Sequence, residues 1–132
     1  MVKSGIAAPR RLRVLVVDDK PRARQSLKAL LATSPHVAEI LEASDGEQAC
    51  ERIEVDRPDV ILMDARMPRL GGIEATQRIQ KRWEGLPVIV LSMYPEYEAP
   101  ALEAGAYGFV SKGEPLERLM ALLVALAEGD QG

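Results

Sequence analysis

The sequence predicts an α/β fold built on a doubly wound, five-stranded parallel sheet with five helices. Short apolar runs alternate with amphipathic segments five times along 132 residues, a length that suits one domain. The runs are nearly all apolar, as expected for strands covered on both faces. Repeated strand–helix units give right-handed crossovers with helices on both sides of the sheet. The predicted strands are Leu12–Val17, Val37–Leu41, Val60–Met63, Val88–Leu91 and Tyr107–Val110.

Each predicted helix has signals of its own. Pro21 suits the first turn of the first helix, where a missing N–H costs nothing, and Leu27 and Leu31 share one face. The second helix opens at residues 44–47, Ser-Asp-Gly-Glu, a capping-box pattern. Pro100 lies inside the fourth helix, so we expect that helix to begin late or to be distorted. The last three helices are predicted over about Gly72–Trp83, over about Glu96–Ala104, and from near Pro115 to a stop at Gly129.

The bulk composition narrows the class of protein. We expect a flexible N-terminal lead-in over residues 1–11, one domain over 12–128 and a tail over 129–132. A formal charge of −3 argues against a chain that binds nucleic acid by itself, because such domains carry a basic surplus. The single cysteine cannot form an internal disulfide. No apolar run approaches the ~20 residues that span a bilayer, and no secretory signal is recognisable, so we expect a cytoplasmic protein without a membrane partner.

Charged residues follow three of the predicted strands. Asp18 and Asp19 close the first strand, Asp64 closes the third, and Lys112 follows the fifth. The carboxyl ends of parallel strands share one edge of the sheet, where ligands of such folds bind. Three carboxylates in one pocket would repel one another, and a hard cation such as Mg²⁺ removes that conflict. The pattern therefore predicts a site for Mg²⁺ and a phosphoryl group, although the aspartate pair alone could simply cap the first helix.

These residues belong to a longer pattern of five segments. The segments are Val-Val-Asp18-Asp19, Leu-Met-Asp64-Ala-Arg-Met67-Pro68, Gly72-Ile-Glu74-Ala75, Val-Leu-Ser92 and Gly105-Ala106-Tyr-Gly108-Phe109-Val-Ser-Lys112. In this order they resemble the receiver domain of two-component response regulators, from about Arg13 to Leu126. The Lys-Gly-Glu segment at 112–114 and Leu-Ser-Met-Tyr at 91–94 are most similar to the NarL/FixJ-type subgroup. The resemblance implies a flavodoxin-like fold with strand order 2-1-3-4-5.

The resemblance also implies a role for each residue of the pocket. Asp64 would accept a phosphoryl group from a phosphohistidine on a sensor histidine kinase, and Lys112 would pair with Asp64 and later with that group. Ser92 would hydrogen-bond a phosphoryl oxygen, and the rotamer of Phe109 would report this event. Phosphoryl transfer needs positioning and neutralised charge, and a carboxylate can form an acyl phosphate, so the chemistry agrees. The implied Mg²⁺ ligands are Asp19 directly, Asp18 largely through water, Asp64, and the main-chain carbonyl of Arg66.

The edge of the pocket departs from the common receiver pattern. Gly113 follows Lys112, where many receivers have a proline joined by a cis bond; a cis bond without proline costs about 2.5–4 kcal/mol, so we expect a trans bond. We expect Met93, Tyr94 and Arg66 at the rim. Met93 would narrow access to the pocket, while Arg66 and Tyr94 would screen the phosphoryl group from water and slow its hydrolysis.

Three functions remain open at this point. The first is the regulatory domain of a DNA-binding transcription regulator whose C-terminal output domain is absent here, so that DNA is contacted only through that domain. Phosphorylation would switch the face formed by the fourth helix, fifth strand and fifth helix, through which a homodimer could form. The second is a stand-alone receiver that binds a protein partner. The third is an aspartyl-phosphate phosphohydrolase, which usually needs an acid where this chain has Arg66. We therefore expect only self-catalysed phosphoryl acceptance and slow autodephosphorylation, not an enzyme.

Overall fold

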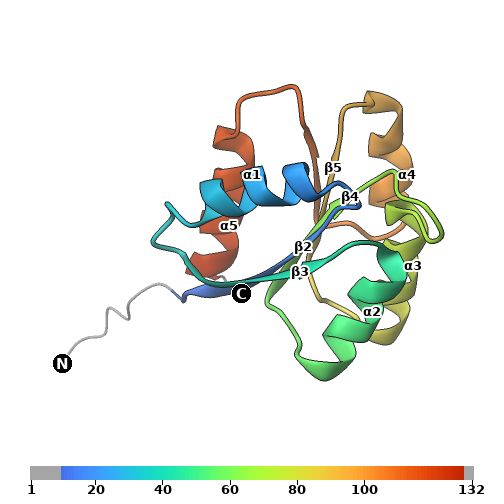
Figure 1. Cartoon of the computed structure of the whole chain (residues 1–132), viewed down its shortest axis with the longest axis horizontal. Coiled ribbons are helices and arrows are strands. Elements are labelled where there is room, and N and C mark those ends of the chain that lie inside the picture. Colours follow the sequence, from blue (N-terminus) through green and yellow to red (C-terminus); the bar gives the residue numbers. More distant parts are fainter. Residues whose placement is uncertain (1–9, 130–132) are drawn as a thin grey trace.

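The computed structural model describes residues 10–129, which form a sheet between two layers of helices (Figure 1). Helices α1 and α5 cover one face of the sheet, and α2, α3 and α4 cover the other. None of the helices in this range is long and apolar enough to cross a membrane. The strands are β2 (Leu12–Val17), β3 (Val37–Ala43), β4 (Val60–Asp64), β5 (Val88–Ser92) and β6 (Gly108–Ser111). The helices are α1 (Pro21–Leu31), α2 (Gly46–Val55), α3 (Gly72–Arg82), α4 (Glu98–Glu103) and α5 (Glu117–Glu128), with a 3₁₀ turn η1 (Pro95–Tyr97).

The sheet topology brings distant strand ends together. All five strands are parallel, in the order β3-β2-β4-β5-β6. Counted along the chain, this is the predicted order 2-1-3-4-5, which the structure confirms. The strand order reverses at β2 and β4, which are neighbours in the sheet, and ligands of doubly wound sheets bind at such a point. The carboxyl ends of β2 and β4 therefore lie side by side at the edge of the sheet where a ligand can bind.

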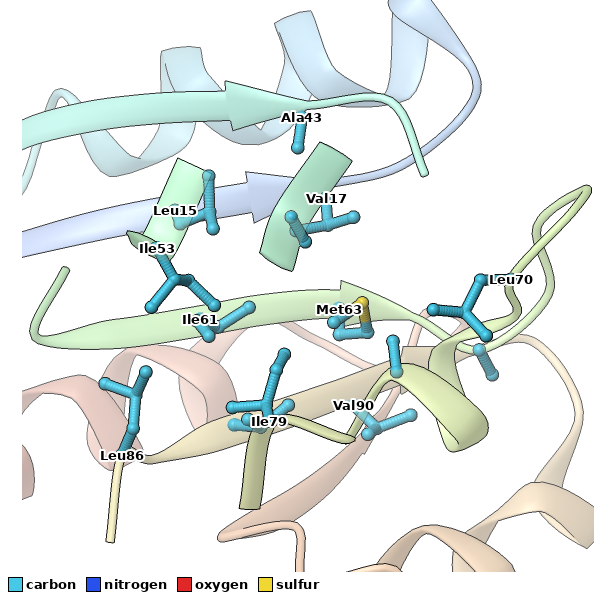
Figure 2. Packing of buried hydrophobic residues seen from close by; sticks show 14 of the residues in the cluster. Leu15, Val17, Ala43, Ile53, Ile61, Met63, Leu70, Ile79, Leu86 and Val90 are labelled. Atoms are coloured by element: carbon cyan, nitrogen blue, oxygen red, sulfur yellow. The ribbon is translucent and has the colours of Figure 1, made fainter. Parts of the chain in front are cut away.

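Two apolar cores fix the sheet between its helices. Figure 2 shows Leu15, Ile61 and Met63 on one face of the central strands, where they pack with Ile53 of α2 and Ile79 of α3. Alternate residues of the same strands point to the other face, because side chains alternate along a strand. That second core joins the strands to α1 and α5 and contains Leu12, Val14, Val16, Leu31, Leu62, Ile89, Leu119 and Leu123.

Some element boundaries differ from the predicted ones. Strand β3 continues to Ala43, because its last residues pair with the full length of β2. The cap of α2 is displaced by one residue from the predicted box: Asp45 accepts a hydrogen bond from the N–H of Gln48 at 2.8 Å, and Gln48 Oε1 accepts one from the N–H of Ser44 at 2.9 Å. This reciprocal pair satisfies backbone donors at the start of the helix.

The fourth helix begins late, which is one of the two outcomes predicted from Pro100; the other was a distortion of the helix. A 3₁₀ turn precedes it, and α4 starts at Glu98, so Pro100 lies in the first helical turn. There its missing N–H removes no intrahelical bond. Helix α5 also starts later than predicted, at Glu117.

The two ends of the described range are close to each other. Residues 1–9 of the predicted lead-in lie outside the described residues, as do 130–132 of the predicted tail. Arg10 donates its N–H to the carbonyl of Ala127 at 3.1 Å, and Arg11 Nη2 donates to the carbonyl of Val37 at 3.0 Å. Gly129 has φ 66°, a left-handed conformation that glycine adopts easily and that ends α5.

Candidate functional site

An acidic cluster with one lysine occupies the carboxyl edge of the sheet. Asp18 and Asp19 follow β2, Asp64 ends β4, and Lys112 follows β6. One carboxylate oxygen from each aspartate lies within 4.8 Å of those of the other two. Lys112 Nζ lies 2.7 Å from Asp64 Oδ1 and 3.0 Å from Asp18 Oδ2. The structure therefore brings together the four charged residues that the sequence placed at strand ends.

Asp18 is held by contacts that the sequence did not reveal. Its Oδ1 accepts a hydrogen bond from the N–H of Lys20 at 2.9 Å, and its carbonyl accepts one from Arg24 Nη1 at 2.7 Å. Its other carboxylate oxygen meets Lys112, so this buried side chain has every oxygen occupied. Asp18 therefore acts as the fixed anchor of Lys112.

Asp19 differs because one of its oxygens has no partner. Among residues 10–129, Asp19 Oδ1 is the buried side-chain oxygen without a hydrogen bond, since Lys20 Nζ is 3.7 Å away. A buried carboxylate oxygen left unsatisfied is costly. Mg²⁺ takes oxygen ligands and is often held by one or two carboxylates, so this donor set fits that ion.

The segment between β4 and α3 packs closely against the carboxyl end of β4. Gly72 donates its N–H to the carbonyl of Ala65 at 3.0 Å, and a Cβ at position 72 would overlap the carbonyl oxygen of Asp64. On the other side, the N–H of Gly46 donates to the carbonyl of Leu70 at 3.2 Å. These contacts fix both ends of the segment that carries Arg66, whose main-chain carbonyl is a predicted metal ligand.

Burial and the neighbouring opposite charge shift the pKa values of Asp64 and Lys112 in opposite directions. Burial raises the pKa of Asp64, Lys112 opposes this effect, and Asp18 adds to it, so the pKa lies above its ordinary value. Burial lowers the pKa of Lys112, but Asp64 and Asp18 together outweigh burial and leave it raised. Lys112 therefore remains a cation near neutral pH. A perturbed carboxylate beside a fixed cation in a cleft is typical of a functional site.

A pocket of about 780 Å³ opens above the cluster. Asp19, Asp64, Ser92 and Lys112 line it, together with the expected rim residues Arg66, Met93 and Tyr94. The Arg66 guanidinium carbon lies 4.9 Å from the centre of the Tyr94 ring, within the range of a cation–π contact.

The rim contains one aromatic residue that the sequence analysis missed. Tyr97 also lines the pocket, and its ring meets Tyr94 edge to face at a centroid distance of 6.2 Å. The spacing of three residues between the two tyrosines was the available signal, because one turn of 3₁₀ helix places such residues on the same side. Met93 at the rim is exposed, with 59% of its surface accessible to solvent.

The two predicted switch residues occupy different layers. Ser92 is buried beside the pocket, and its Oγ accepts a hydrogen bond from the N–H of Tyr94 at 3.0 Å. Phe109 is buried in the core beneath, so it is not brought into the pocket lining. The bond between Lys112 and Gly113 is trans, as expected, because the described residues contain no cis peptide.

The five-stranded parallel sheet and the acidic cluster at its carboxyl edge define an α/β ligand-binding domain. The response regulator receiver domain family matches residues 14–124, so the chain belongs to that family. Among solved structures, a two-component response regulator of the LuxR family from Aurantimonas sp. SI85-9A1 is 32% identical, with a TM-score of 0.82, over 89% of this chain and 86% of the other. The response regulator protein TrrA from Thermotoga maritima, solved with Mg²⁺ and BeF, is 30% identical, with a TM-score of 0.80, over 86% and 97%.

Curated relatives agree with this assignment and with the predicted subgroup. The transcriptional regulatory protein DegU of Brevibacillus brevis is 33% identical over 121 residues, which cover 90% of this chain and 51% of DegU. The response regulator UvrY of Escherichia coli is 32% identical over 91% of this chain and 56% of UvrY. The chain thus spans about half the length of the curated relatives it matches.

Proposed function

We propose that the domain accepts a phosphoryl group on Asp64 from a phosphohistidine of a sensor histidine kinase. An Asp64 carboxylate oxygen would attack phosphorus, the P–N bond would break, and the imidazole would leave as the neutral ring after taking up a proton. The observation that carries this proposal is the 2.7 Å contact between Lys112 Nζ and Asp64 Oδ1, beside an Asp19 oxygen without a partner. A carboxylate can form such an aspartyl phosphate.

The residues at the strand ends divide the remaining work. We propose that Asp19 and Asp64 bind Mg²⁺ directly, Asp18 largely through water, and the main-chain carbonyl of Arg66 completes the set. When bound, the ion neutralises charge on the phosphoryl oxygens. Lys112 is held by Asp18 at 3.0 Å, so its ammonium group stays beside the transferred group and pairs with a phosphoryl oxygen.

Ser92 and Phe109 are the proposed links from the pocket to the surface. Ser92 Oγ already accepts the N–H of Tyr94, and its hydroxyl proton is available to a phosphoryl oxygen. A shift of Ser92 toward that oxygen would open space that Phe109 enters from the core. The phosphoryl group would thereby favour one of two existing states of the face formed by α4, β6 and α5.

The rim favours a long-lived phosphoryl group over catalytic turnover. Arg66 and Tyr94 contact each other and both line the pocket, which supports a role in screening water. An aspartyl-phosphate phosphohydrolase would usually need an acidic residue at position 66, two residues after the nucleophile, and this chain has arginine there. We therefore propose slow autodephosphorylation and no enzymatic turnover of phosphate esters.

The output is proposed from the relatives. DegU is named as a transcriptional regulatory protein, and about half of it lies outside the match. We propose that this domain is the regulatory part of such a cytoplasmic regulator, with DNA contacted only by an output domain outside the 132 residues. A homodimer through α4, β6 and α5 belongs to the same proposal. A stand-alone receiver that binds a protein is the alternative, and the natural reading frame distinguishes the two.

Labelling with acetyl phosphate and Mg²⁺, followed on a phosphate-affinity gel, tests the acceptor. We expect Asp64→Asn to abolish labelling, because the amide is not a nucleophile for this transfer. Asp56→Asn is the matched control, since Asp56 is exposed and pairs with Arg13 far from the pocket. Undiminished labelling of Asp64→Asn would assign the acceptor elsewhere.

A further inference from the structure

One residue with a side chain is held in a left-handed backbone conformation in the segment that borders the pocket. Among residues 10–129, Arg69 is the only residue other than glycine with a positive φ, at 64°. This conformation is disfavoured for residues with a Cβ and persists where the surroundings enforce it. Arg69 lies between β4 and α3, three residues after Arg66, which lines the pocket. The contacts around Arg69 therefore decide whether this segment keeps its shape.

The first residues of α2 hold Arg69 from outside its own segment. Arg69 Nη1 lies 3.6 Å from Oδ2 of Asp45, which is the N-cap of that helix. The Asp45 side chain is only 8% exposed, and its Oδ1 caps α2 by accepting the N–H of Gln48. Within residues 10–129, Arg69 is the cation that pairs with this buried carboxylate, and burying a carboxylate without a partner is costly. One oxygen of Asp45 thus serves the helix and the other serves Arg69.

A backbone contact next to this ion pair joins the same two segments. The N–H of Gly46 donates to the carbonyl of Leu70 at 3.2 Å, and the Leu70 side chain is buried in the core (Figure 2). A Cβ at position 46 would lie 2.8 Å from that carbonyl oxygen, so the close approach needs glycine. Asp45 with Arg69 and Gly46 with Leu70 are therefore two adjacent contacts between α2 and the segment that follows β4.

The chain between the end of β4 and these contacts has little freedom. Ala65 is fixed by two backbone hydrogen bonds, one to β5 and one from Gly72, each at 3.0 Å. Pro68 fixes its own φ and restricts the residue before it. Arg66 lies inside this stretch, so Ala65 at one end and Arg69 at the other limit the position of its main-chain carbonyl.

We propose that Asp45 is a positioning residue for the Mg²⁺ site and that it acts through Arg69. The inference rests on the proposed function, in which the main-chain carbonyl of Arg66 binds the ion. The ion pair offsets the cost of the left-handed conformation of Arg69, and that conformation sets where the Arg66 carbonyl lies. Asp45 is not among the residues that line the pocket. It therefore contributes to the affinity for Mg²⁺ and not to the transfer itself.

Isothermal titration of the 132-residue chain with MgCl₂, without a phosphoryl donor, tests the inference. Asp45→Asn keeps an oxygen for the helix cap but removes the charge that pairs with Arg69. Arg69→Ala removes the cation and keeps a Cβ at the left-handed position. The Arg69 side chain is 78% exposed, and exposed ion pairs contribute little, so we expect the Mg²⁺ Kd to rise about two- to fivefold in each variant. The double variant should bind no more weakly than either single variant, because both changes remove the same contact.

Arg69→Gly separates the backbone effect from the loss of charge. Glycine also lacks the ion pair, but it adopts a φ of 64° without strain. We therefore expect its Mg²⁺ Kd to stay closer to the wild-type value than that of Arg69→Ala. Arg78→Ala is the matched control, because Arg78 pairs with Glu47 of α2 at 3.8 Å and this pair does not involve the segment between β4 and α3. It should leave the Kd unchanged.

The Mg²⁺ dependence of labelling by acetyl phosphate separates positioning from a general loss of stability. We expect the half-saturating Mg²⁺ concentration to rise by the same factor as the Kd, while the rate at saturating Mg²⁺ stays at the wild-type value. Equal Kd values in wild type, Asp45→Asn and Arg69→Ala would overturn the inference, as would a loss in Arg69→Gly as large as in Arg69→Ala. Neither result touches the acceptor, which the labelling of Asp64→Asn tests separately. A wild-type chain that binds no Mg²⁺ would overturn the proposed metal ligands together with this inference.

Discussion

Replacing Gly72 by alanine tests how the fold holds the acidic strand end. Gly72 begins α3, and its N–H donates to the carbonyl of Ala65 at 3.0 Å. An added Cβ would overlap the carbonyl oxygen of Asp64 and would lie 2.9 Å from Cα of Ala65. Both neighbours are backbone atoms, so no side chain can rotate away. Either the first turn of α3 or the end of β4 has to move.

The size of the effect follows from these distances. The optimal separation of non-bonded carbon atoms is about 3.5–4.0 Å. The added Cβ and Cα of Ala65 would therefore have to move apart by roughly 0.6–1.1 Å. Overpacking of this kind costs about 1–3 kcal/mol, and losing the hydrogen bond from Gly72 to Ala65 adds about 1 kcal/mol. We therefore expect Gly72→Ala to lower the free energy of unfolding by about 2–4 kcal/mol. A 1 Å displacement of Asp64 can also slow the transfer by about 10²-fold.

Urea unfolding and the rate of labelling by acetyl phosphate with Mg²⁺ measure the two effects. Gly71→Ala is the matched control, because a Cβ there lies 3.5 Å from the carbonyl oxygen of Ala65 and φ is −73°. We expect that variant to stay within about 0.5 kcal/mol of wild type. If both alanines lower stability equally, close approach at position 72 is not what positions Asp64.

Two further predictions concern the rim and the surface of the sheet. Arg66→Ala and Tyr94→Ala should each speed loss of the phosphoryl group from the labelled domain, because each removes one partner of the contact between them; an unchanged dephosphorylation rate in both would contradict the screening role. Lys28 holds the pKa of Glu42 below its ordinary value, burial opposes this, and Arg24 assists. The resulting stabilisation is present above the unfolded-state pKa of about 4.3 and is lost as the pH falls through the folded-state value. Glu42 is 34% exposed, so screening limits the cost of Glu42→Gln at pH 7 to under about 1 kcal/mol. Unfolding curves should show that cost shrinking toward pH 3; a difference independent of pH would exclude the charge effect.

Local patterns in the sequence determined most of the fold. The apolar runs predicted all five strands, most clearly β4 and β5, which are buried along their whole length and therefore apolar on both faces. Strand β3 lies at the edge of the sheet and contains the exposed Glu39, so its pattern is less uniform. The apolar runs also placed Asp18, Asp19, Asp64 and Lys112 at one edge, since parallel strands end on the same side. Pro100 predicted either a late start or a distortion of the fourth helix, and the structure shows the late start.

Packing between distant segments decided the rest. Lys112 contacts both Asp18 and Asp64, which depends on how closely two strands and a loop approach. Arg69 adopts φ 64°, a conformation disfavoured for side chains with a Cβ, and no local signal indicated it. The unsatisfied oxygen of Asp19 likewise appears only when its surroundings are assembled. Residue type and spacing determine local secondary structure over one or two turns. The distances between side chains, their burial and their hydrogen-bond partners depend on how the whole chain packs.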